Sequence, residues 1–235
     1  MPRYGLGLFW HKIEDALKSL IPVYDKVNRV ISLGQDIRFR RLGVIKAIRG
    51  EDLIVLDAGC GPGTLTDLIL KQTDYIKQII LLDPIRAMLN QSKRRLNDER
   101  TYFVQAVFEY LPFKNEVFDA VVSAFALRDA FDLSSAISEI SRVVKTVGGR
   151  LLIVDLGKPE NMLLQAAIGV YWRIFAPLLA LAYIGRYGSI YRLLYLTYVK
   201  LPTNPALKRM IKRFFKYVDL EEKLVGGVVI LIAKN

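Results

Sequence analysis

An acidic residue followed by three glycines at alternate positions is the part of this sequence best suited to chemistry. Residues 53–56 form a short apolar run that predicts a buried strand, and Asp57 closes it. Gly59, Gly61 and Gly63 follow at alternate positions. Glycine has no Cβ, so the backbone can turn with positive φ and a ligand can approach it closely. A helix that starts near Gly63 would present unpaired N–H groups and the positive end of its dipole, so the turn predicts a cofactor site.

Two cofactor classes use a turn of this kind, and a turn without a ligand is the alternative. Dinucleotide sites need G-x-G-x-x-G, but here the third glycine falls one residue early and Thr64 takes its place. The D-x-G-x-G-x-G spacing is instead similar to the first motif of S-adenosylmethionine (SAM)-dependent methyltransferases. A second apolar run, residues 79–82, ends at Asp83, which can accept both ribose hydroxyls. The candidate cofactor-binding residues at this turn and at the strand ends are Asp57, Gly59, Cys60, Gly61, Pro62, Gly63, Asp83, Pro84, Val107, Phe108 and Ala124.

Length and composition limit the classes of protein to which the chain can belong. The 235 residues fit one large α/β domain with room for an addition that covers the substrate. The single cysteine, Cys60, cannot form an internal disulfide, and it is better suited to filling the tight turn than to acting as a nucleophile. The formal net charge of +11 suggests an anionic partner, which leaves three alternatives: nucleic acid, an anionic membrane surface, or neither.

Strand-like and helix-like segments alternate after the glycine turn. Apolar runs predict strands at residues 53–56, 79–82, 102–107, 118–124, 151–156 and 228–233, with helices at 65–71, 85–96 and 136–144. Such alternation builds a parallel sheet with helices on both faces. Ligands then lie at the carboxyl ends of the strands, where Asp57, Asp83 and Asp155 fall.

Helical segments flank this core in the sequence. Residues 10–49 are predicted to be helical throughout, and Tyr24, Asp25 and Asn28 lie within one turn and share a polar face. His11, the one histidine, is interpreted as a surface or interface residue.

Two later segments bear on membrane contact. Residues 162–184 are apolar and long enough to cross a bilayer, but Arg173 and Pro177 argue against a spanning helix. We interpret the segment as a lid or pocket wall that is partly interfacial. Residues 205–217 predict a two-faced helix, docked on the sheet by its apolar stripe, whose basic face can meet anionic headgroups.

Several longer motifs together resemble one family. The stretch from Tyr24, YDKVNRVISLGQDIRFRR, is similar to Y-D-x-x-N…S-x-G…W-R-R, and residues 124–129, AFALRD, are similar to x-F-G-L-R-N. Leu-Pro-Phe at 111–113 before Phe-Asp, and Arg-Val-Val-Lys before Gly-Gly, also match. These motifs are those of the ubiquinone and menaquinone C-methyltransferases, the UbiE or demethylmenaquinone methyltransferase family, and the resemblance runs from the second helix to the last strand.

The resemblance implies a Rossmann-like class I methyltransferase fold. This α/β fold has a seven-stranded, mostly parallel sheet with an antiparallel last strand, N-terminal helices, and a helical insertion before the last two strands. One domain is expected over 1–235. It comprises a helical cap (1–50), a SAM-binding core (51–157), a helical substrate-pocket insertion (158–216) and the final strands (217–235).

The resemblance also implies an activity and the residues that perform it. The expected reaction transfers a methyl group from SAM to a ring carbon of a prenylated quinol, with S-adenosylhomocysteine as product and no metal. Arg128, Tyr24, Asp25 and Asp129 are the expected catalytic residues, and Tyr24, Asn28, Arg128, Tyr191 and Tyr195 are expected to bind the acceptor.

Three positions leave alternatives open. Arg128 is expected to stabilise the developing phenolate or to order a water that takes its proton, and a salt bridge to Asp129 or Asp132 is the alternative interpretation. Asp129 replaces the asparagine usual in the family, and it is either a base or a group that pins Arg128. Val107 replaces an Asp or Asn, so adenine would be read by the backbone around Val107 and Phe108.

The expected location is cytoplasmic, peripheral to the inner face of the membrane and in contact with its anionic surface, with a homodimer left open. The alternatives are a SAM-dependent methyltransferase of RNA or of another lipid or small molecule, and a non-catalytic SAM-binding subunit. Residues 124–129 lack the Asn/Asp-Pro-Pro-aromatic pattern of amino-methylating nucleic-acid enzymes, so we expect no nucleic acid partner.

Overall fold

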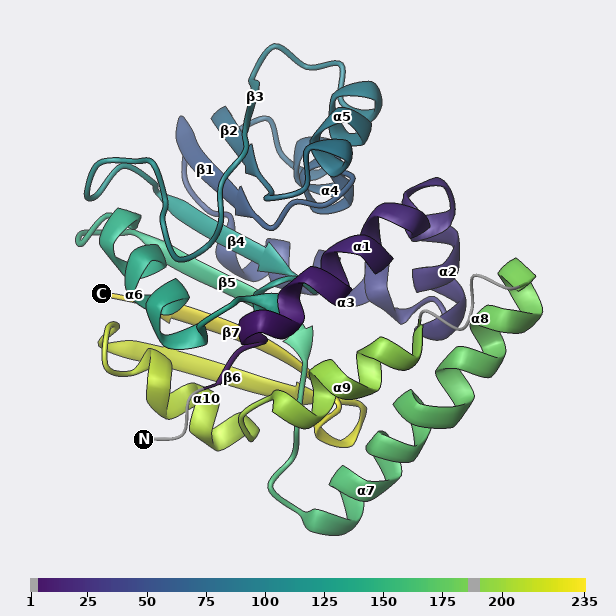
Figure 1. Cartoon of the computed structure of the whole chain (residues 1–235). Helices are drawn as coiled ribbons and strands as arrows, with labels where there is room; N and C mark the ends of the chain where they lie inside the picture. Colours follow the sequence, from purple (N-terminus) through teal and green to yellow (C-terminus); the bar gives the residue numbers. More distant parts are fainter. Residues whose placement is uncertain (1–3, 186–190) are drawn as a thin grey trace.

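A seven-stranded sheet in the order β3-β2-β1-β4-β5-β7-β6 forms the centre of the molecule (Figure 1). The computed structural model describes residues 4–185 and 191–235. The strands are β1 (Leu53–Ala58), β2 (Ile76–Leu82), β3 (Thr101–Val104), β4 (Ala120–Ala124), β5 (Arg150–Leu156), β6 (Tyr217–Lys223) and β7 (Val228–Lys234). The first five pair in parallel, and β7 is antiparallel to both β5 and β6. The predicted mostly parallel sheet with an antiparallel last strand is confirmed.

Helices cover both faces of the sheet because its strands are apolar on both sides. In β5, Leu151 and Ile153 pack with α6 (Leu133–Val143) and α10 (Asn204–Ile211) on one face. Leu152 and Val154 belong to the core on the other face. The helices on that face are α3 (Gln35–Ala47), α4 (Thr64–Gln72) and α5 (Arg86–Arg95).

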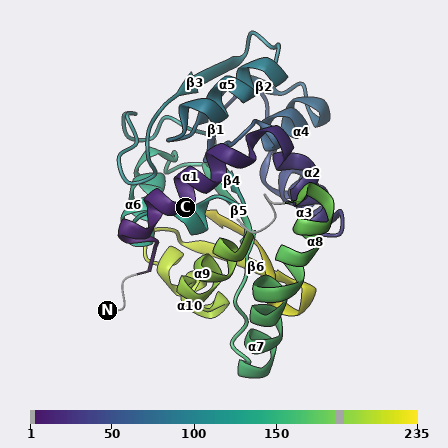
Figure 2. The ribbon, with the colours of Figure 1, turned by 45° about the vertical axis from the view of Figure 1, so that its right-hand side comes forward.

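A third apolar cluster joins the N-terminal helices to the insertion before β6. It packs α1 (Trp10–Leu20) and α2 (Tyr24–Ile31) against the helices of the insertion, α7 (Met162–Val170), the π-helix η4 (Tyr171–Phe175), α8 (Ala176–Ile184) and α9 (Arg192–Lys200). Helix α1 crosses beside the end of β4 in both views (Figures 1 and 2). The joined helices α7, η4 and α8 form a long rod at the edge of the molecule, on the side away from β3 (Figure 1).

Two predicted elements are shorter than expected. The predicted strand 102–107 ends at Val104 because β3 is an edge strand that pairs only with β2, and that pairing ends at Leu82 with Val104. The predicted helix 205–217 ends at Ile211, and Tyr217 begins β6 opposite Lys234. Ending the helix early lets the following turn bury Phe215, so the predicted docking of the apolar stripe against the sheet is still confirmed.

Residues 162–184 form a helix whose length and composition would suffice to cross a membrane. Only 28% of its most apolar window is buried within the protein. One side of the helix therefore packs on the protein and the other is open to its surroundings.

Candidate active site

The glycine turn has the left-handed backbone that the sequence predicted. Gly59, Gly61 and Gly63 have φ of 73°, 53° and 81°, and α4 begins directly after Gly63. A Cβ on Gly59 would lie 2.5 Å from the Ala126 Cβ and 2.8 Å from the Phe108 ring. A side chain at this position therefore meets both strain and a clash. A Cβ on Gly61 would meet no atom within 4 Å, so this glycine leaves open space beside the backbone.

The acidic residues that end β1 and β2 are buried and hydrogen-bonded. Asp57 accepts a bond from Thr66 Oγ1 at 2.7 Å, and burial raises its pKa to about 7. Asp83 accepts bonds from the backbone N–H groups of Gly61 and Ile85, both at 2.9 Å, and burial raises its pKa to about 6. Each carboxylate oxygen of Asp83 accepts one protein hydrogen bond, which leaves lone pairs for two ligand hydroxyls.

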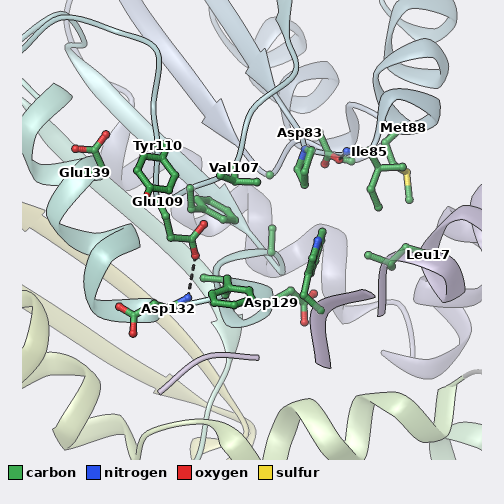
Figure 3. Close-up of a pocket in the computed structure, with 18 of the residues that line it drawn as sticks. Leu17, Asp83, Ile85, Met88, Val107, Glu109, Tyr110, Asp129, Asp132 and Glu139 are labelled. Atoms are coloured by element: carbon green, nitrogen blue, oxygen red, sulfur yellow. Dashed lines mark hydrogen bonds between the residues drawn. The ribbon is translucent and has the colours of Figure 1, made fainter. Parts of the chain in front are cut away.

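The cavity beside this turn, called here the main cavity, has a volume of about 620 Å³. Figure 3 shows residues from the core and the N-terminal cap around it, with Asp83 and Met88 above, Asp129 below and Leu17 at the right. Six predicted cofactor-binding residues line it: Gly59, Gly61, Asp83, Pro84, Val107 and Phe108. Five others lie outside the lining: Asp57, Cys60, Pro62, Gly63 and Ala124.

Of these five, Cys60 is explained by its surroundings. Its Sγ lies 3.5 Å from the Gly61 carbonyl oxygen and 4.0 Å from Ser92 Oγ. Burial raises the pKa of the thiol well above its ordinary value, so Cys60 fills space and is no nucleophile.

Several residues of the main cavity were missed by sequence reasoning. Trp10 and Leu17 come from the cap, Ile85 and Met88 follow Asp83, and Phe125 follows β4. Phe125 has φ of 57°, which is strained for an aromatic residue, and such strain is concentrated at functional sites. Its ring lies 4.7 Å from the Arg40 guanidinium. The matched motif at 124–129 includes this residue, but nothing in the sequence indicates its positive φ.

The charged side chains that line the main cavity are acidic. Among the described residues that line it, five are acidic and none is basic: Asp83, Glu109, Asp129, Asp132 and Glu139. A cationic sulfonium nucleoside fits these carboxylates. Its ribose hydroxyls can donate hydrogen bonds to Asp83, and the acidic walls attract its positive charge. The phosphates of a nucleic acid do not fit it. Within residues 4–185 and 191–235, no cluster of three or more His, Cys, Asp or Glu side chains could hold a metal ion.

Arg128 lies in the 3-10 helix η3 (Leu127–Asp129) and forms a buried charge cluster with two carboxylates. Its Nη1 donates to Asp155 Oδ1 at 2.8 Å, and its backbone N–H donates to Asp155 Oδ2 at 3.0 Å. Its Nη2 lies 3.7 Å from Asp129 Oδ2. Asp155, noted in the sequence only as a strand end, is thus its main partner. The other partner considered, Asp132, instead caps α6 through the Ser135 N–H.

The protonation of this cluster follows from burial and charge. Burial raises the pKa of Asp129 to about 6, and the Arg128 guanidinium limits the rise. Burial lowers the pKa of Arg128, but the Asp129 and Asp155 carboxylates outweigh it, so the net shift is upward. Arg128 therefore stays cationic, while Asp129 titrates close to neutral pH.

A small cavity of about 40 Å³, called here the polar cavity, lies next to the cluster. Tyr24, Asn28, Arg128, Asp129 and Tyr191, all predicted site residues, line it together. Three polar atoms at its walls are buried without a hydrogen-bond partner in the described structure: Arg128 Nε, Asp129 Oδ1 and Tyr191 Oη. Leu17, Tyr24 and Asp129 also line the main cavity, so these three residues separate the two spaces.

Two predicted site residues lie elsewhere. Asp25 accepts a hydrogen bond from Thr64 Oγ1 at 2.7 Å and pairs with Arg95, so it ties α2 to the start of α4. Tyr195 lies in a surface groove beside Arg173, whose guanidinium is 5.6 Å from its ring. The helical spacing that groups Asp25 with Tyr24, and Tyr195 with Tyr191, does not bring either pair to one cavity.

Comparisons with known proteins agree with this geometry. Residues 9–234 match the model of the ubiE/COQ5 methyltransferase family. A ubiquinone/menaquinone biosynthesis C-methyltransferase UbiE of Hahella chejuensis is 30% identical over 91% of this chain and 86% of its own. A demethylmenaquinone methyltransferase of Thermus thermophilus is 31% identical over 82% and 87%.

Solved structures support the fold alone. The methyltransferase chain matched in a complex with the Haloferax volcanii Trm112 activator has a TM-score of 0.66 at 14% identity, covering 93% of this chain and 96% of that one. A SAM-dependent methyltransferase of Aquifex aeolicus has a TM-score of 0.58 at 15% identity, over 89% and 96%.

Proposed function

The chain belongs to the ubiE/COQ5 methyltransferase family and is a SAM-dependent methyltransferase, and from this premise we propose that its acceptor is a prenylated quinol methylated at a ring carbon. SAM binds in the main cavity, with its ribose at Asp83 and the glycine turn beside it. The relatives named for ubiquinone and menaquinone biosynthesis support a quinol as the acceptor class.

The polar cavity is the observation that supports an acceptor with a hydroxyl group. A buried donor or acceptor without a partner is costly, so three at one place indicate a bound polar group. A quinol hydroxyl can donate to Asp129 Oδ1 and accept from Tyr191 Oη, while its ring stays in the main cavity beside Tyr24. Asn28 completes the wall from α2.

The residues around the quinol hydroxyl have separate roles in the removal of its proton. Asp129 takes the hydroxyl proton on Oδ1, and with a pKa of about 6 it is ionised and near the pH at which a base works well. Asp155 is the close partner of Arg128, and Asp129 keeps Oδ1 without a hydrogen-bond partner in the described structure, so this oxygen can take the proton. Arg128 stabilises the phenolate through its positive charge. Tyr24, half-buried between the two cavities, holds the ring and excludes water.

When bound, SAM supplies an electrophilic methyl group on a cationic sulfur. The negative charge left on the quinol oxygen is shared with the neighbouring ring carbon. The new carbon–carbon bond would form there as the bond between sulfur and methyl breaks, which leaves S-adenosylhomocysteine. The ring becomes aromatic again when that carbon loses its hydrogen and the oxygen regains one. One proton is released for each methyl group transferred, and the main cavity positions the two reacting centres.

We also infer a location at the inner face of the membrane, in contact with anionic lipid. A prenylated acceptor is dissolved in the bilayer, so the enzyme must meet it at the surface. The net charge of +11 supports contact with anionic headgroups. RNA fits the net charge as well, but the acidic walls of the main cavity oppose it.

The test is methyl transfer from labelled SAM to reduced, short-chain demethylmenaquinol, with tRNA as a separate acceptor. We expect label in the quinol. Tyr191→Phe removes the unpartnered hydroxyl and should raise KM for the quinol about tenfold, the value of roughly one hydrogen bond. The control is Tyr198→Phe in α9, which directly follows Tyr191. The Tyr198 hydroxyl donates to the Gln165 carbonyl oxygen at 3.1 Å, so this variant should leave that KM unchanged. Label in tRNA alone, or no label despite SAM binding, would contradict the proposal.

A further inference from the structure

The rod formed by α7, η4 and α8 has one buried and one exposed side. Trp172, Ala176 and Ala180 recur every four residues and pack against Val27 and Ile31 of α2. The opposite side, called here the apolar row, exposes side chains that are 45–55% accessible: Val170, Ile174, Phe175, Leu178, Leu181 and Tyr183. A soluble surface seldom gathers large apolar side chains in one row, so this row indicates a binding surface.

A groove runs beside the apolar row, between the rod and α9, and is called here the outer groove. Its volume is about 640 Å³. Ile174, Leu178, Leu181 and Leu196 supply apolar walls, and Arg173 and Arg192 lie among them. An apolar channel with guanidinium groups beside it suits a molecule that is apolar along its length and anionic at one end.

The charged residues of the segment that contains the rod, α9 and α10 are all basic. Residues 161–218 contain nine basic residues and no acidic residue, so nearly all of the net charge of +11 lies here. The exposed cations Arg192 and Lys200 follow in α9, and Lys208 and Arg209 follow in α10. A second copy of this surface would bring like charges together, which opposes self-association. An anionic bilayer satisfies both the cations and the apolar row.

We propose that the apolar row and the outer groove bind the surface of a bilayer that contains anionic phospholipid. The apolar row enters the acyl boundary, and Arg173 and Arg192 meet the phosphates. The helix lies in the plane of the interface, because its other side is already packed on α2. This inference rests on the proposed function, since it names the surface through which a membrane-dissolved acceptor is approached.

The surface adjoins the candidate active site. Trp172, next to Arg173 in η4, lines a small cavity together with Tyr24 and Arg128. In α9, Leu194 lines the same cavity, and the following residues, Tyr195 and Leu196, line the outer groove. One layer of helix therefore separates the membrane surface from the residues proposed to hold the quinol ring.

The experiment measures binding of the full chain to sedimented vesicles of phosphatidylcholine, with or without 30% phosphatidylglycerol as an added anionic component. We expect binding that requires phosphatidylglycerol. Phe175→Glu combined with Leu178→Glu should weaken it about tenfold or more, because two half-exposed side chains of the row become anionic. Arg173→Glu with Arg192→Glu should remove the preference for phosphatidylglycerol. Val147→Glu, at an 88% exposed apolar residue before β5, is the matched control and should bind as the wild type does.

Methyl transfer separates this inference from the proposed function. The Phe175→Glu, Leu178→Glu variant should methylate a short-chain quinol in solution like the wild type and lose activity on a long-chain quinol in vesicles. A wild type that methylates neither acceptor contradicts the proposed function, while vesicle binding still decides the surface. Unchanged vesicle binding by this variant overturns the inference. So does light scattering that shows a wild-type dimer converted to a monomer by the same two substitutions, because the surface would then join two copies.

Discussion

Replacing Asp129 by asparagine distinguishes a catalytic base from a residue that only holds Arg128. The substitution keeps the shape of the side chain and leaves Arg128 paired with Asp155, so the buried cluster retains one cation and one anion. The fold should therefore survive, and thermal melts should be close to those of the wild type. Removing the base should lower kcat/KM for the quinol by about 10²–10⁴-fold.

The pH dependence of kcat/KM is an independent test of Asp129 as the base. With a pKa of about 6, the Asp129 carboxyl is about nine-tenths ionised at pH 7 and about one-tenth ionised at pH 5. Wild-type kcat/KM should therefore fall about tenfold for each pH unit well below 6. The assay is initial-rate methyl transfer to short-chain quinol from pH 5 to 8, with SAM saturating so that titration of Asp83 does not limit the rate.

The Asp129→Asn variant should be nearly flat over this range. A variant within threefold of the wild type, or one that keeps the inflection near pH 6, would refute the assignment of the base. Asp129 would then be a residue that pins Arg128, which is the other interpretation the sequence allowed.

Three further predictions follow from the geometry of the turn. Asp25→Asn should weaken SAM binding, measured by calorimetry, more than it lowers kcat, because Asp25 holds Thr64 at the start of α4 and Arg95 at the end of α5. Loss of kcat alone would contradict this. Gly59→Ala should abolish SAM binding and lower the melting temperature, because its Cβ would lie 2.5 Å from that of Ala126; normal binding would show that the turn can shift. Asp57 has a folded pKa raised to about 7, so the folded state holds a proton that the unfolded state releases near pH 4. The stability that this bound proton contributes is fully present below about pH 4 and is lost as the pH rises through 7. The melting temperature of the wild type should therefore fall between pH 5 and 8, and Asp57→Asn should reduce that fall.

Several motifs that identify the family turn out to support the fold. Arg142, in the Arg-Val-Val-Lys motif, donates to the carbonyl oxygens of Leu111 and Phe113 at 3.0 and 2.8 Å. Lys145 of the same motif pairs with Asp119 at 2.6 Å. The Leu-Pro-Phe and Phe-Asp segments are thus held by the motif at the end of α6. Their presence identifies the fold strongly, but it says nothing about the acceptor.

The sequence by itself determined the sheet, the glycine turn and most of the candidate site. Short continuous apolar runs predicted the parallel strands, because a strand buried on both faces must be apolar throughout. Motif matching selected Tyr24, Asn28, Arg128, Asp129 and Tyr191, which come from three separate helices and meet at the polar cavity.

Only the tertiary structure decided which neighbours in sequence share that cavity. Asp25 and Tyr195 follow the same helical spacing as the site residues but face Arg95 and the outer groove. Asp155 became the partner of Arg128 because β5 lies beside β4 in the sheet, a pairing of segments 27 residues apart. Local pattern reports which side chains share a face of one helix or strand, whereas a site is made by the packing of several elements. That packing also gives Phe125 its strained backbone and decides which side of the apolar segment 162–184 is exposed. The sequence showed that the segment is apolar, but it did not show which of its side chains are left uncovered.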